Sequence, residues 1–117
     1  MKLLVDTDAF CKLGVAQLFD VALGIFDLGP TECGRLAALP YMLRRGSLPR
    51  RFGIDACLAL VPIAESMTVA PEASPRWLEA LATASNVDPG EAQLLAAAAD
   101  SNIPILWGDK RALRAVK

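Results

Sequence analysis

Three acidic residues stand where carboxylates could act together. Asp6 ends the apolar stretch 3–5, Glu91 opens an alanine-rich stretch, and Asp109 comes two residues after the apolar stretch 103–107. The chain has no histidine, so acid–base or metal chemistry would have to come from carboxylates. Clustered carboxylates need a cation to offset their repulsion, and hard oxygen ligands suit Mg²⁺ or Mn²⁺. If the strands that lead to Asp6 and Asp109 are neighbours, the three acids predict a site for such an ion.

Each acid also has a purely structural interpretation, which the sequence leaves open. Glu91 stands three residues after Asp88, which is the spacing of a capping box. Asp6 and Asp109 each follow an apolar stretch and could cap the next helix. For the first helix we expect Asp8 to be the cap.

Short apolar runs alternate with stretches of helical spacing along the chain. We expect strands at residues 2–6, 25–28, 66–69 and 103–107. We expect helices at residues 9–14, 15–24, 31–43, 52–60, 76–84, 88–99 and 111–116. This alternation predicts an α/β fold in which helices cover both faces of a parallel sheet. The length of 117 residues predicts a single domain, residues 1–117.

One segment is strongly basic, although the net charge of the whole chain is −1 and gives no support for nucleic-acid binding. It carries Arg44, Arg45, Arg50 and Arg51. By composition we expect a loop there, which is either a solvated linker or a rim that faces phosphate groups. Lys110 and Arg111 follow Asp109 and could extend such a rim around an acidic centre.

The cysteines and the apolar runs bear on location. The three cysteines, at positions 11, 33 and 57, are odd in number and lack metal-binding spacing, so we expect buried free thiols in a reducing compartment. Only three apolar residues separate Lys2 from Asp6, so we expect no signal peptide. No apolar run approaches the roughly 20 residues that span a membrane. We therefore expect a cytoplasmic protein without membrane contact.

Three segments together resemble PIN domains. Residues 3–10 (LLVDTDAF) are similar to the opening strand of that family, which ends in Asp-Thr. Residues 88–98 (DPGEAQLLAAA) are similar to its segment in which Gly-Glu-Ala opens an alanine-rich helix. Residues 105–112 (ILWGDKRA) are similar to the strand that precedes its last acid. The order and spacing of all three agree with the family, and the middle of the chain matches only in its helix–strand rhythm.

The resemblance implies a three-layer α/β/α sandwich and a Mg²⁺- or Mn²⁺-dependent ribonuclease. Many members of the family are toxins of bacterial toxin–antitoxin pairs, so it also implies RNA as substrate, an antitoxin protein as partner and a homodimer. Asp6, Glu91 and Asp109 match the family's first, third and fourth acids, and would be catalytic and metal-binding. Glu32 is the nearest residue to the second, catalytic acid, and Glu65 is a poorer candidate.

Three departures from the family pattern keep other functions open. Arg35-Leu36 could occupy the register of the second acid, Trp107 stands where the family has Thr or Ser, and the chain ends soon after Asp109. The first alternative is therefore a PIN-like module that binds a partner with weak or no catalysis. The second is a phosphatase of the haloacid-dehalogenase type, because Asp6-Thr7-Asp8 resembles its Asp-x-Asp pair.

Overall fold

A four-stranded sheet forms the centre of the fold. The structure is a computed structural model, which describes residues 1–72, 75–76, 79 and 89–107. All of the strands are parallel, in the order β3-β2-β1-β4, which confirms the predicted α/β class. The strands are β1 (Leu3–Val5), β2 (Cys33–Arg35), β3 (Thr68–Val69) and β4 (Ile105–Leu106). Their carboxyl ends therefore share one edge of the sheet, which is where open α/β folds bind ligands.

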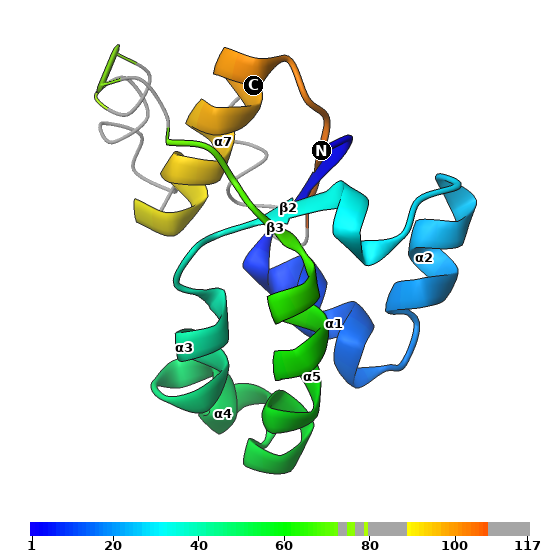
Figure 1. The fold of residues 1–117 in the computed structure, drawn as a ribbon. Helices are drawn as coiled ribbons and strands as arrows, with labels where there is room; N and C mark the ends of the chain where they lie inside the picture. The colour runs from blue at the N-terminus through cyan, green and yellow to red at the C-terminus, as the bar shows by residue number, and fades with distance from the viewer. Residues whose placement is uncertain (73–74, 77–78, 80–88, 108–117) are drawn as a thin grey trace.

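Helices connect the strands and cover the sheet (Figure 1). They are α1 (Thr7–Val15), α2 (Phe19–Ile25), the 3₁₀ helix η1 (Pro30–Glu32), α3 (Leu39–Arg44), α4 (Ser47–Phe52), α5 (Ile54–Ser66) and α7 (Pro89–Ser101). Among the described residues, none of these helices combines the length and apolar character needed to cross a membrane. The helices predicted at residues 76–84 and 111–116 fall mostly or wholly outside the described residues.

The two faces of the sheet bury different clusters, which makes three layers. Leu3 and Val5 of β1 belong to the larger cluster, together with buried side chains of α1, α3 and α5. Leu4, which lies between them on the strand, belongs to a second cluster with Leu94 and Ala97 of α7. Successive strand residues point to opposite faces, so a single strand supplies both clusters. The arrangement is an α/β/α sandwich, with α7 on one face and α1, α3 and α5 on the other.

The second strand lies later in the chain than predicted. The apolar run 25–28 is not a strand, because α2 ends at Ile25, whose side chain is 79% exposed, and the chain then turns at Asp27 with φ of 57°. The strand is Cys33–Arg35, inside the region predicted as a helix over 31–43. Three residues that include a glycine and an arginine carry no apolar strand pattern. Pairing with the strands on either side makes this segment a strand.

The basic segment is largely helical and not the predicted loop. Arg44 ends α3, Gly46 turns the chain with φ of 96°, and Arg50 and Arg51 lie in α4. Pro49 is tolerated in α4 because the first N–H groups of a helix have no partner within it. The next helix, predicted to end near residue 60, continues as α5 to Ser66.

Candidate active site

Asp6 lies between β1 and α1 and is held from both sides. Its N–H donates to the carbonyl of Leu106 at 3.0 Å, and its carbonyl accepts from the N–H of Phe10 at 2.9 Å. Asp6 is thus the N-cap residue of α1, but its carboxylate makes no capping hydrogen bond. The residue is only 2% exposed. Asp6 therefore places a buried carboxylate at the carboxyl edge of the sheet. Helix capping does not explain this carboxylate, because it makes no capping hydrogen bond.

Glu91 comes to the same edge from α7. This helix leads into β4, the neighbour of β1, so it runs back across the sheet and begins at the carboxyl edge. Glu91 is in its first turn, three residues before Leu94, and such residues share one helix face. Leu94 packs in one cluster with Leu4, which precedes Asp6 by two residues on β1. Glu91 and Asp6 thus both lie on the carboxyl side of this cluster, and Glu91 is also buried.

The donor set of these two acids fits a hard divalent cation. Ionised carboxylates carry like charges, and removal from water strengthens the repulsion between like charges that lie close together. Mg²⁺ or Mn²⁺ would reduce it, since such ions bind through one or two carboxylates and keep several waters. Within the part of the chain that the structure describes, no group of three or more Cys, Asp or Glu side chains could hold a metal. Asp109, the third acid that the sequence indicates, lies outside the described residues.

Strand β4 ends at this edge of the sheet. β4 pairs with β1, with Leu106 opposite Val5, so the chain leaves β4 beside Asp6. Trp107 comes directly after the strand and is half-buried. The sequence predicts that Asp6 and Asp109 converge if the strands that lead to them are neighbours. Strands β1 and β4 are neighbours.

Glu32 does not join the pair. It lies directly before β2, at the amino edge of the sheet, whereas Asp6 is at the carboxyl edge. Lys2 Nζ lies 3.2 Å from Glu32 Oε2, and the N–H of Gly29 donates to Glu32 Oε1 at 3.2 Å. This hydrogen bond and then the one from Lys2 lower the pKa of Glu32. The expectation that Glu32 lies in a helix after the second strand is therefore wrong.

The helix that does follow β2 brings no acid to the site. It is α3, and its sequence LPYMLR has no carboxylate. Glu65, the other candidate, is exposed at the end of α5 and is 3.1 Å from Arg44. The described residues therefore supply no second acid of the family type.

Arg35 is the third buried charged residue among those described, and no local sequence pattern indicates its burial. It ends β2 on the face of Cys33, which packs in the α5 cluster, away from α7. Its Nε donates to the carbonyl of Ala64 at 2.6 Å, and its Nη1 donates to the carbonyls of Leu36 and Ala37 at 3.0 and 3.2 Å. Arg35 thus ties the chain after β2 to the end of α5.

Asp8 has a different role from the predicted one. It lies inside the first turn of α1, whose N-cap is Asp6. Its two oxygens are 2.8 Å from Lys12 Nζ and 3.0 Å from Arg51 Nη2. The spacing of Lys12 indicates the first pair, since residues four apart meet on a helix. No local signal indicates Arg51.

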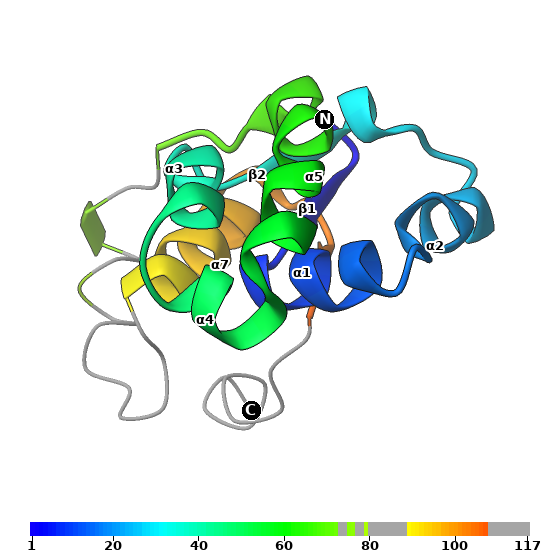
Figure 2. The same cartoon turned by 90° about the horizontal axis from the view of Figure 1, so that it is seen from below.

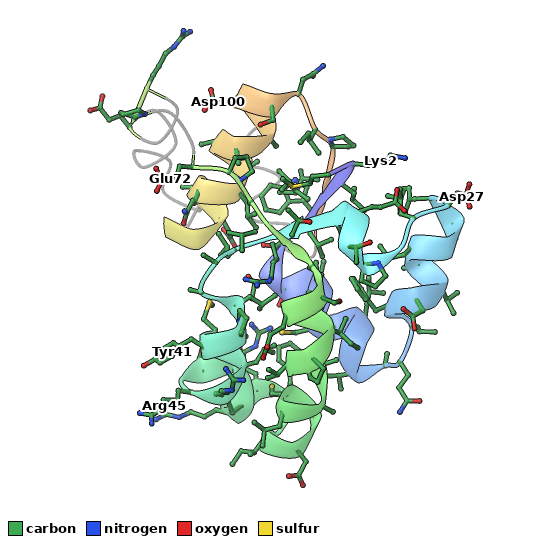
Figure 3. The ribbon with its side chains drawn as sticks, viewed as in Figure 1. Lys2, Asp27, Tyr41, Arg45, Glu72 and Asp100 are labelled. Atoms are coloured by element: carbon green, nitrogen blue, oxygen red, sulfur yellow. The ribbon has the colours of Figure 1, made fainter. Side chains whose placement is uncertain are left out.

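The basic residues divide into groups. Arg51 is joined to α1 beside Asp6, and Arg44 is joined to Glu65. Arg45 and Arg50 are exposed and form no ion pair with any described residue. Figure 3 shows Arg45 at the end of the molecule opposite Lys2. Lys110 and Arg111 lie outside the described residues.

Helix α4 lies next to the start of α1, as Figure 2 shows, and the ion pair between Arg51 and Asp8 joins the two helices.

Comparisons with family models, curated proteins and solved structures gave no match to this chain. The PIN resemblance therefore rests on the three sequence segments.

Proposed function

We propose that this chain is a Mg²⁺- or Mn²⁺-dependent ribonuclease that hydrolyses RNA phosphodiester bonds. The observation that carries the proposal is the burial of Asp6 and Glu91 at one edge of the sheet, next to the cluster that contains Leu4 and Leu94. Asp109 is the third acid of the proposal, from its position two residues after Trp107.

The chain's own residues hold Asp6 and Glu91 in position and bury them. The backbone bonds of Asp6 to β4 and α1 hold its carboxylate in place. The cluster that contains Leu4 and Leu94 holds α7, which carries Glu91, against the sheet. When bound, Mg²⁺ or Mn²⁺ lowers the pKa of a coordinated water and stabilises charge on phosphate oxygens.

The test is Mn²⁺-dependent cleavage of single-stranded RNA by the wild-type chain and by Asp6→Asn, Glu91→Gln and Asp109→Asn. Each of these variants should lose at least about 100-fold in rate, because each removes a charged ligand or base. Glu32→Gln is the matched control, since it removes an acid at the opposite edge, and it should cleave at the wild-type rate. Metal-dependent cleavage that survives Asp6→Asn at the wild-type rate would contradict the proposal.

A second candidate is a PIN-like binding module without catalysis. The absence of an acid from α3 favours it, because that helix follows β2 where the family has its second acid. The cleavage assay, combined with calorimetric titration with Mn²⁺, separates the two functions. A silent module should bind the ion through Asp6 and Glu91 and leave RNA intact.

The phosphatase alternative receives less support. It requires Asp6 and Asp8 to act as a pair, whereas Asp8 is in α1 and engages Lys12 and Arg51. Hydrolysis of p-nitrophenyl phosphate that depends on both Asp6 and Asp8 would revive it.

The narrower proposals are a toxin that is held by an antitoxin, a homodimer and a cytoplasmic location. An exposed apolar strip on and around α2 supports a protein partner; it consists of Leu18, Val21, Ile25 and Phe26. The three buried free cysteines support a reducing compartment. Light scattering during size-exclusion chromatography tests the dimer, which should have twice the mass of the chain.

A further inference from the structure

An ion pair joins α4 to α1 beside the candidate active site. Arg51 Nη2 lies 3.0 Å from Asp8 Oδ1, although the two residues are 43 positions apart in the sequence. Asp8 is in the first turn of α1, two residues after Asp6. The pair therefore brings an arginine from the basic segment to the helix that begins at a proposed metal ligand.

Asp8 is the fixed partner in this pair. Its side chain is 16% exposed, whereas those of Arg51 and Lys12 are 55% and 54% exposed. Lys12 Nζ is 2.8 Å from the second oxygen of Asp8, so the carboxylate is held between two cations. Exposed ion pairs contribute little to folding stability, but they restrict where a long side chain points. The direction of Arg51 is thus set by an anchor on α1.

A second contact restricts the guanidinium further. Its central carbon lies 4.8 Å from the centre of the Phe52 ring, which is a cation–π contact. A guanidinium has five N–H donors, and the contact with Asp8 uses the Nη2 group. The exposed remainder of the fork can bind phosphate oxygens, which match its planar geometry.

The charges of Arg51 and Asp6 both affect the pKa of Cys11, which lies in α1. Burial raises the pKa of the Cys11 thiol to about 12. The negative charges of Asp8 and Asp6 add to this rise, and the positive charge of Arg51 opposes it. The guanidinium and both carboxylates are therefore within electrostatic range of a single side chain. This agrees with the place of α4 next to the start of α1 in Figure 2.

We propose that Asp8 is a positioning residue that holds Arg51 at the rim of the Asp6–Glu91 site, where Arg51 binds the phosphate backbone of the RNA. This inference rests on the proposed ribonuclease function. It separates Arg51 from the other arginines of the basic segment, which have no anchor on α1. Arg51 should fix the register of the RNA without reading its bases, since phosphate contacts carry no sequence information.

The chain offers a matched control for this ion pair. Arg44 and Glu65 also form an arginine–carboxylate pair, at 3.1 Å, with the arginine side chain 51% exposed. That pair joins α3 to α5 and does not involve the helix that begins at Asp6. Asp8→Asn and Arg51→Gln are therefore compared with Glu65→Gln and Arg44→Gln, which remove the same charges elsewhere.

The first measurement is RNA binding, by fluorescence anisotropy of a labelled single-stranded oligouridylate, with Ca²⁺ in place of Mn²⁺ to prevent cleavage. Arg51→Gln should raise Kd roughly fivefold to tenfold and reduce the slope of log K against log salt by about 0.7, as expected for one phosphate contact. Asp8→Asn should raise Kd in the same direction, because Arg51 loses its anchor. Glu65→Gln and Arg44→Gln should change Kd less than about twofold.

The second measurement separates positioning from a direct role in metal binding. Calorimetric titration with Mn²⁺ should give Asp8→Asn and Arg51→Gln affinities within about threefold of wild type. In cleavage assays both variants should raise KM and leave kcat nearly unchanged, since the contact is made equally in the ground state and the transition state. A loss of Mn²⁺ affinity in Asp8→Asn, together with unchanged RNA binding, would overturn the inference.

A charge reversal excludes a merely structural role. Asp8→Arg combined with Arg51→Asp restores an ion pair between α1 and α4 but places an acid on α4. If the pair only tethers the two helices, the double variant should bind RNA like the wild-type chain, and the inference would be wrong. The charge reversal at position 8 also removes the ion pair with Lys12, so some loss of stability is expected, and circular dichroism should show that the double variant still folds. We expect it to bind RNA at least as weakly as Arg51→Gln.

Failure of the inference is distinguishable from failure of the proposed function. If the wild-type chain cleaves RNA with Mn²⁺ while Asp8→Asn and Arg51→Gln match it in Kd and KM, the inference alone fails. If the wild-type chain neither binds nor cleaves RNA, the ribonuclease proposal fails and the inference with it.

Discussion

Lys2 Nζ and Glu32 Oε2 are 3.2 Å apart and join the residue before β1 to the residue before β2. The contact lies at the amino edge of the sheet, because the two strands are parallel and pair from Leu3 and Cys33 onward. Glu32 is thus separated by the length of the strands from Asp6, which follows β1 at the other edge. Glu32, which the sequence indicates as a catalytic acid, therefore has a structural place at the amino edge, away from Asp6.

Glu32 should matter for stability at acidic pH and not for cleavage. The Gly29 N–H and then Lys2 lower its pKa from 4.5, so its folded pKa is below its unfolded one. Such a group stabilises the fold above the unfolded pKa, and the contribution is lost as pH falls through the folded pKa. Urea denaturation at a series of acidic pH values should therefore show a weaker pH dependence in Glu32→Gln than in wild type. Equal pH dependence in the two chains would contradict the assignment.

Arg35→Met should destabilise the chain strongly. The substitution keeps an apolar stem but removes the donors to the carbonyls of Ala64, Leu36 and Ala37. The expected loss is about 2–4 kcal/mol, as for a buried, hydrogen-bonded charge. Urea denaturation monitored by circular dichroism measures it.

The matched control for Arg35 is Arg50→Met, because Arg50 is exposed on α4. It should change stability by no more than about 0.5 kcal/mol. Arg35→Lys keeps the charge but not the planar fork, so we expect an intermediate loss. A stability of Arg35→Met equal to that of the control would show that these hydrogen bonds do not hold the end of α5.

Gly34→Ala tests the packing between β1 and β2. A Cβ at Gly34 would lie 2.1 Å from Met1 Sδ and 2.6 Å from Leu4 Cδ2. Met1 is 40% exposed and can move, but Leu4 is fully buried and pairs with Gly34 in the sheet. The expected loss is about 1–3 kcal/mol, as for other overpacked cores.

Gly24→Ala is the opposite case at another glycine. Gly24 lies in α2, and a Cβ there meets nothing within 4 Å. Alanine is the better helix former, so the variant should gain up to about 1 kcal/mol. Thermal melting of the two variants should give shifts of opposite sign. A stable Gly34→Ala would mean that Leu4 can move within the core.

The cysteines should be inert in the native chain. Cys11, Cys33 and Cys57 are buried, and burial raises the pKa of each thiol, that of Cys11 to about 12. The thiolate is the reactive form, so a colorimetric thiol reagent at neutral pH should modify the native chain far more slowly than the urea-unfolded chain. Rapid labelling without urea would contradict the burial.

The same raised pKa has a consequence at alkaline pH. Because the folded pKa of Cys11 is above its ordinary value of 9.0, its contribution to stability is present below 9.0 and is lost as pH rises toward about 12. Cys11→Ala should lose less stability than wild type between neutral pH and a pH of about 10. Equal losses would show that the pKa of the Cys11 thiol in the folded chain is not raised above its ordinary value.

The amino-acid sequence by itself determined the α/β class, the segments of β1, β3 and β4, and the helix that begins near residue 89. These segments carry local signals: an apolar run that ends in a polar residue, or Asp-Pro before an alanine-rich stretch. The three buried free cysteines also follow from the sequence alone. Asp6 and Glu91 could be named together because the strand before Asp6 and the strand after the helix of Glu91 are both recognisable in the sequence.

Only the tertiary structure decided the place of β2 and the residues that depend on it. The segment Cys33–Arg35 is a strand because β1 and β3 pair with it on both sides, and no local pattern in CGR carries that information. Moving the strand from residues 25–28 to 33–35 moves Glu32 from the expected helix to the amino edge. The contact of Arg51 with Asp8 spans 43 residues and likewise depends on how α4 packs on α1. Local periodicity sets which segments form helices and strands, whereas contacts between distant segments decide which side chains share a site.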